Sequence, residues 1–204
     1  MRRGLLATAC VASALLGCGD DPVSPPPDNG QKPDGTLTVV RFDPVLFQSA
    51  QKTGSFWAVK GEDRELELLY DDSSGPGSDE FLEFEVDADA LLQRPDGTFF
   101  QEGDSILITV TVDPEGDFLF DFQPSGLRFN PDEPAELEVN FSLADPDVNR
   151  DGVVDAEDVA LREALEVWQQ ESLGEDWIRL LTLRIRDDEI RADVGGFTTF
   201  AAAN

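Results

Sequence analysis

Residues 105–123, SILITVTVDPEGDFLFDFQ, carry the clearest structural signal in the chain. Apolar side chains occupy every second position on each side of a short turn: Ile106, Ile108, Val110 and Val112 before it, and Phe118, Phe120 and Phe122 after it. This period of two predicts strands that bury one face. The DPEGD turn at 113–117 is short enough for a hairpin, so we expect the two strands to pair antiparallel.

Similar runs, separated by Gly, Pro, Asp and Asn, continue through most of the chain from Thr36 onward. The strongest predicted strands are 64–70, 80–86, 105–113, 117–123, 135–143 and 176–187. Weaker candidates are 36–42, 54–60, 98–101, 127–130, 189–194 and 197–202. Helical crossovers are absent from most of this region, which favours a mainly β fold, an antiparallel β-sandwich, over a parallel sheet.

One segment departs from this pattern. Residues 155–173 are DAEDVALREALEVWQQESL. The segment has acidic residues in its first turn, and it stops directly before Gly174. The side chains at helical spacing are Leu161, Ala164, Leu165 and Trp168. The segment therefore predicts one amphipathic helix packed on the sandwich.

Acidic residues dominate the charge of the chain. It has 43 Asp and Glu against 15 Lys and Arg, a net charge of −28, and no histidine. Nucleic acid carries the same sign of charge, so it is not an expected partner. The lack of histidine excludes Ser-His-Asp and Cys-His hydrolases and His-ligated zinc. No pair of carboxylates stands out among so many acids, and we expect no enzymatic activity.

The N-terminus has the organisation of an export signal. Arg2 and Arg3 precede an apolar run at residues 4–16, which is shorter than the roughly 20 residues that span a bilayer. The run ends in Leu15-Leu16-Gly17-Cys18, which resembles the lipobox of bacterial lipoproteins. The resemblance implies that residues 1–17 are a signal peptide and that Cys18 carries the lipid. An ordinary secretory signal and an uncleaved membrane anchor are the alternatives.

Residues 18–35 differ in composition from the rest of the chain. They contain five prolines and no apolar periodicity, so we interpret them as an extended tether between the lipid and the folded part. The predicted folded domain is 36–204, with a calcium loop and helix at 147–173. We therefore expect the protein to be exported to the bacterial cell envelope and anchored by its lipid to the outer membrane or cell surface.

The twelve residues 147–158, DVNRDGVVDAED, have the spacing of a calcium loop, which supplies oxygens from positions 1, 3, 5, 7, 9 and 12. The predicted Ca²⁺ ligands are Asp147, Asn149, Asp151, the carbonyl of Val153, Asp155 and Asp158. Gly152 allows the sharp turn, and Val154 is expected to pack into the core. The alternative is an acidic turn that caps the helix.

This loop resembles the EF-hand calcium loop, and more specifically the dockerin form, in which the pattern leads directly into a helix. Residues 135–143, AELEVNFSL, are predicted to be a strand, so no helix precedes the loop, as in dockerins. Dockerins carry two such repeats, and this chain has one. A single loop favours a structural calcium ion over a calcium sensor, because sensing uses paired loops.

A second resemblance covers residues 81–141. The segments FEVDADAL, SILITVTVDP and FQPSGLRFNPDEPAELEVNF are similar to the β-sandwich module of zonula occludens proteins, ankyrins and netrin receptors. The resemblance implies a sandwich fold and a binding or scaffolding role without catalytic residues.

Together these patterns predict a non-enzymatic, calcium-binding envelope lipoprotein. Its expected partners are the membrane, through the lipid on Cys18, and a surface protein or glycan. A dockerin-like docking module is one alternative, and it requires an exposed apolar helix face at Leu161, Leu165 and Trp168. A carbohydrate-binding module is another, in which Trp57, Trp168 or Trp177 would stack on sugars.

Overall fold

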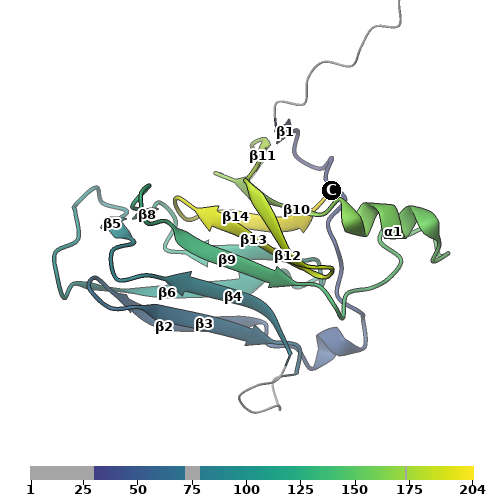
Figure 1. The fold of residues 1–204 in the computed structure, drawn as a ribbon, viewed down its shortest axis with the longest axis horizontal. Helices are drawn as coiled ribbons and strands as arrows, with labels where there is room; N and C mark the ends of the chain where they lie inside the picture. Colours follow the sequence, from purple (N-terminus) through teal and green to yellow (C-terminus); the bar gives the residue numbers. More distant parts are fainter. Residues whose placement is uncertain (1–29, 72–78, 173) are drawn as a thin grey trace, which may run out of the picture.

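The computed structural model describes residues 30–71, 79–172 and 174–204. The chain forms two antiparallel β-sheets packed face to face, an antiparallel β-sandwich with one α-helix (Figure 1). The strands are β1 (Gln31–Lys32), β2 (Thr53–Val59), β3 (Arg64–Leu69), β4 (Glu80–Val86), β5 (Leu91–Gln93), β6 (Ser105–Val112), β7 (Leu119–Gln123), β8 (Arg128–Phe129), β9 (Ala135–Asn140), β10 (Glu166–Gln170), β11 (Trp177–Arg179), β12 (Thr182–Arg186), β13 (Glu189–Val194) and β14 (Thr199–Ala203). The helices are α1 (Ala156–Glu163) and a short 3₁₀ turn at Leu46–Gln48.

One sheet has seven strands in the order β1-β11-β10-β14-β7-β6-β2, and the other has five in the order β12-β13-β9-β4-β3. A separate two-stranded ribbon pairs β5 with β8. The predicted hairpin at 105–123 is confirmed: β6 and β7 pair antiparallel, with Val110 opposite Phe122 and Val112 opposite Phe120. The mainly β, antiparallel prediction is therefore confirmed.

Phenylalanine rings fill the space between the two sheets. Phe84 of β4 is fully buried, and its ring centre lies 5.0 Å from that of Phe122 on the opposite sheet and 5.4 Å from that of Phe197. At the other end of the core, Phe42 stacks on Phe118 at 4.0 Å. The alternating apolar positions of the strands thus meet in one core, because the two sheets turn the same residue class toward each other.

Residues 30–42 lie along the seven-stranded sheet. The N–H of Val40 donates to the carbonyl of Ala202 at 3.0 Å, and Val39 packs with Leu37 into a small second cluster around Trp168 and Ala201. The predicted strand at 36–42 forms only isolated bridges. The predicted tether reaches Gly35, whereas β1 already pairs with β11 at the sheet edge. The predicted signal peptide, the predicted lipidation site Cys18 and the predicted tether up to residue 29 lie outside the described residues.

The predicted helix 155–173 is wrong beyond Glu163. Helix α1 has eight residues, and residues 166–170 form β10 in the interior of the seven-stranded sheet, paired with β14 and β11. Leu165 and Val167 are buried on the same side of this strand. Their separation of two residues is the period of a strand, whereas Leu165 and Trp168 are also three residues apart, as on a helix. The long-range pairing with β14 selects the strand.

Candidate functional site

The predicted calcium loop lies between β9 and α1, beside one end of the sandwich (Figure 1). Its first carboxylate, on Asp147, accepts two backbone N–H groups of the loop. The nitrogen of Asp151 lies 3.1 Å from Oδ1, and the nitrogen of Gly152 lies 2.8 Å from Oδ2. Gly152 has a φ of +87°, a left-handed conformation that glycine adopts without strain. The loop therefore turns sharply around the Asp147 carboxylate.

Asp158 closes the loop from the first turn of α1, and only 2% of its surface is exposed. Its Oδ2 accepts the N–H of Asp155 at 2.9 Å, and its Oδ1 accepts the N–H of Asn149 at 3.2 Å. These hydrogen bonds, that of Asp155 first, lower the pKa of the Asp158 carboxyl from its ordinary value, so the group is ionised at neutral pH. The carboxylates at both ends of the loop thus face its backbone.

The predicted ligand oxygens between these two carboxylates also accept backbone N–H groups. Asn149 Oδ1 accepts the N–H of Asp151 at 3.0 Å, and Asp151 Oδ1 accepts the N–H of Val153 at 2.8 Å. Asp155 is the N-cap of α1, where its Oδ1 accepts the N–H of Glu157 at 2.8 Å. Carboxylate and amide oxygens each have two lone pairs, so one hydrogen bond leaves acceptor capacity for a cation.

Arg150 connects the loop to the sandwich. Its backbone is left-handed, with a φ of 62°, and its guanidinium donates to Asp117 Oδ1 at 2.7 Å and to the Val39 carbonyl at 3.0 Å. Arg41 reaches the same Asp117 oxygen at 3.1 Å. The one basic side chain of the loop therefore pairs with Asp117 of the sandwich. No basic side chain of the loop itself neutralises the loop carboxylates.

The structure corrects which valine joins the loop to the core. Val154, the predicted core residue, is 60% exposed, whereas Val148 is 3% exposed. Val148 follows Asp147 directly, so the turn around that carboxylate carries its side chain inward. Both valines are apolar residues of the same short loop, so the sequence alone does not distinguish them.

The loop carboxylates do not meet at one point. Among the described residues, no group of three or more acidic side chains stands in a position to hold a metal ion. The six predicted ligands share one loop, and their oxygens are of the hard type that calcium prefers. In this conformation their side chains accept loop N–H groups, so the donor chemistry fits calcium while the coordination shell is not assembled.

The three tryptophans separate into two environments. Trp168 and Trp177 are 2% and 5% exposed, and Trp168 Nε1 donates to the carbonyl of Ala203 at 3.1 Å. Trp57 on β2 is 59% exposed. Of the three indoles considered for sugar stacking, only that of Trp57 presents a large surface to solvent.

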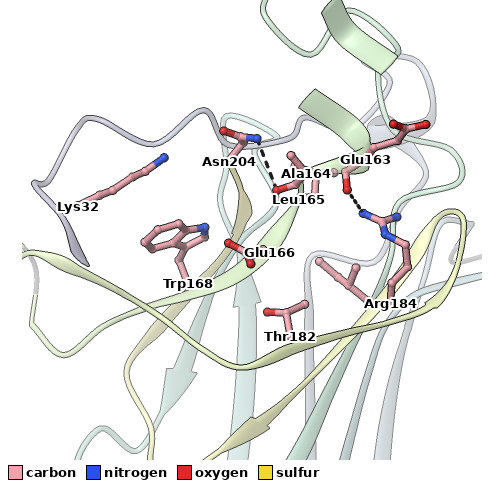
Figure 2. Close-up of a pocket in the computed structure, with 10 residues that line it drawn as sticks. Lys32, Glu163, Ala164, Leu165, Glu166, Trp168, Thr182, Arg184 and Asn204 are labelled. Atoms are coloured by element: carbon pink, nitrogen blue, oxygen red, sulfur yellow. Dashed lines mark hydrogen bonds between the residues drawn. The ribbon is translucent and has the colours of Figure 1, made fainter. Parts of the chain in front are cut away.

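A pocket of about 390 Å³ opens between the C-terminal end of α1, β10 and β12 (Figure 2). Its polar side chains hold these elements together: Arg184 donates to the carbonyl of Glu163 at 3.0 Å, and Asn204 donates to that of Ala164 at 3.5 Å. Lys32 Nζ lies 5.1 Å from the centre of the Trp168 ring. The polar side chains that line the pocket therefore already bind neighbouring elements of the fold.

Comparison of the chain with protein-family models, with curated proteins and with solved structures gives no match. The comparisons assign no family. Among the described residues, no helix has both the length and the apolar character needed to cross a membrane.

Proposed function

We propose that this protein is a non-enzymatic domain of a bacterial envelope lipoprotein and that the loop 147–158 binds one structural Ca²⁺. The observation that carries the proposal is that the Asp147 and Asp158 carboxylates, at the two ends of the loop, both accept backbone N–H groups from the same short loop. Dense negative charge on one loop, with Arg150 turned to Asp117, favours a bound cation.

The ion would be held by Asp147, Asn149, Asp151, Asp155, Asp158 and the carbonyl of Val153. Bound calcium supplies positive charge that offsets the repulsion between these carboxylates. Because the loop joins β9 to α1, and α1 leads into β10 of the other sheet, holding the loop fixes the crossing between the two sheets. The expected effect is on stability, since ligand that binds only the folded state shifts unfolding by mass action.

The docking alternative loses its main support. It requires an exposed apolar helix face at Leu161, Leu165 and Trp168. Leu165 and Trp168 are each 2% exposed and lie outside α1, and Leu161 within α1 is half-buried. A partner that needs these side chains could not reach them in the folded domain. A structural role for the loop is therefore favoured over docking through it.

Thermal unfolding tests the calcium proposal. With an extracellular-type affinity of about 10⁻⁴ M, calcium at about 10 mM stabilises by about 2.7 kcal/mol. That free energy raises the Tm of a domain of this size by roughly 5–10 °C. Magnesium at the same concentration should give a smaller rise, because it requires a more regular octahedral shell.

The double variant Asp147→Ala, Asp151→Ala should lose the calcium-dependent rise. The control is Asp132→Ala, Glu133→Ala, which removes the same charge from an exposed turn and should keep it. If wild-type protein shows no calcium-dependent rise in Tm, or if both double variants lose that rise equally, the loop is an acidic helix cap.

The proposed lipid anchor is tested separately. The substitution Cys18→Ser should move the protein from the membrane fraction to the soluble fraction.

A further inference from the structure

The two outer faces of the sandwich differ in charge. On the five-stranded sheet, Glu83 stands directly opposite Glu67 on one side and Glu138 on the other. The seven-stranded sheet has no charged residue in β2 (TGSFWAV) or in β6 (SILITVTV). In a chain with 28% charged residues, these adjacent strands form a neutral surface.

Trp57 is the large exposed aromatic side chain of this neutral surface, on the edge strand β2. It is 59% exposed and lies directly opposite Leu107 of β6, which is 43% exposed. Leu37 and Val39 pack near Trp168 and Ala201, on the β10 and β14 part of the same sheet. Trp57 and Leu107 lie on the β2 and β6 part, at the far edge of the strand order.

Hydroxyl and amide side chains, together with one carboxylate on Asp121, form rows on one side of the indole. Strand register places Ser55 opposite Thr109 and Thr53 opposite Thr111. The next strand, β7, continues these rows with Gln123 opposite Thr109 and Asp121 opposite Thr111. Alternate residues of a strand share a face, so these side chains flank Trp57 and Leu107 on the outer surface.

Hydrogen bonds within the protein already hold some of these side chains in place. Gln123 Nε2 donates to Asp121 Oδ2 at 3.0 Å, and its Oε1 accepts the N–H of Ser125 at 3.1 Å. Thr53 Oγ1 donates to the carbonyl of Val110 at 3.1 Å, which leaves its oxygen as an acceptor. Side chains held on regular strands lose little conformational entropy when a ligand binds.

We propose that the outer surface of β2, β6 and β7, with Trp57 as its aromatic contact, binds a neutral glycan chain. One pyranose ring stacks its C–H face on the indole, and the hydroxyl and amide groups beside it exchange hydrogen bonds with the sugar hydroxyls. The charge of the protein selects a neutral ligand, because a net charge of −28 repels anionic polysaccharides. This site lies on a different element from the calcium loop and does not depend on it.

Titration of the full protein with cellohexaose, xylohexaose, maltohexaose and chitohexaose tests the proposal, with calorimetry and tryptophan emission as readouts. Since two of the three indoles are buried, a saturable emission change reports on Trp57. We expect at least one of these neutral oligosaccharides to bind. In Trp57→Ala, calorimetric affinity should fall by about tenfold or more, the loss of roughly 1.4 kcal/mol of ring contact.

Phe99→Ala is the matched control, because Phe99 is a 60% exposed aromatic residue outside β2, β6 and β7. It should bind as wild type does, and both variants should keep the wild-type Tm. A second variant, Gln123→Ala, should weaken binding without altering the emission of the free protein. The proposal is overturned if none of the four oligosaccharides binds, if Trp57→Ala binds as tightly as Phe99→Ala, or if polygalacturonate binds as well as the neutral chains.

Discussion

Removing one negative charge from the outer face of the five-stranded sheet should stabilise the protein. Glu83 lies on β4, in the middle of three adjacent strands, directly opposite Glu67 of β3 and Glu138 of β9. Partial burial raises the pKa of the Glu83 carboxyl, and the charges of Glu138 and the neighbouring glutamates raise it further. The folded protein therefore holds this carboxylate in an unfavourable position at neutral pH.

The substitution Glu83→Gln keeps the size of the side chain and removes the charge. Each directly opposed like-charge pair costs about 0.2–1 kcal/mol. Arg191 offsets part of the charge of Glu138, with its Nη2 2.9 Å from Glu138 Oε2, and the face is solvated. We therefore expect a gain of about 0.5–1 kcal/mol, which raises the Tm by roughly 1–4 °C in a domain of this size.

The pH dependence gives an independent check. A carboxyl whose pKa is raised by folding binds its proton more tightly in the folded state, so its protonation stabilises the fold. For Glu83 and Glu85, whose pKa values are both raised from 4.5, this contribution is complete below pH 4.5 and is lost as the pH rises through the folded pKa values. Asp158 acts in the opposite sense, because its lowered pKa makes its contribution disappear as the pH falls below 3.8.

Urea unfolding between pH 7 and pH 4.5 measures this effect. In chelator, Glu83→Gln should be more stable than wild type at pH 7, and the difference should shrink as the pH approaches 4.5. Glu133→Gln, which removes an exposed charge from the turn before β9, should change stability little. The reasoning is refuted if Glu83→Gln is less stable than wild type at pH 7, or if its advantage is as large at pH 4.5 as at pH 7.

Two further substitutions test the core and the helix cap. Phe84→Ala should cost about 3–5 kcal/mol in chemical unfolding, because the ring is fully buried between the sheets. Phe99→Ala, on the surface, should cost less than about 0.5 kcal/mol, and equal losses would contradict the assigned core. Asp155→Ala should cost about 1 kcal/mol in chelator, because the N–H of Glu157 loses its cap. A loss that appears only with calcium present would instead assign Asp155 entirely to the ion.

Local patterns predicted several strands well, but the single strand predicted at 176–187 is wrong: it is two strands, β11 and β12, in different sheets. The bounds of β4 and β13 equal the predicted ranges 80–86 and 189–194. The strand β10 was missed because Leu161, Ala164, Leu165 and Trp168 follow a helical period, which hid the strand alternation of Leu165 and Val167. The pairing of β10 with β14 decides their conformation, and the local sequence around 166–170 does not indicate that β14 is the partner strand.

The loop shows the same division. The spacing of residues 147–158 placed the acidic and amide side chains on one turn before a helix, and the structure contains that turn and helix. The spacing could not show that Arg150 pairs with Asp117, which is far away in sequence. Nor did it show that Val148 rather than Val154 is buried, because both are apolar residues of a short loop.

The sequence by itself determined the class of the fold, since alternation of apolar residues specifies which side chains of a strand share a face. Only the tertiary structure decided which strands share a sheet, because strand order depends on pairing between distant segments. That order brings the glutamates of β3, β4 and β9 together on one outer face. It also places the uncharged strands β2 and β6 side by side, so that Trp57 lies in a neutral surface of an otherwise acidic protein.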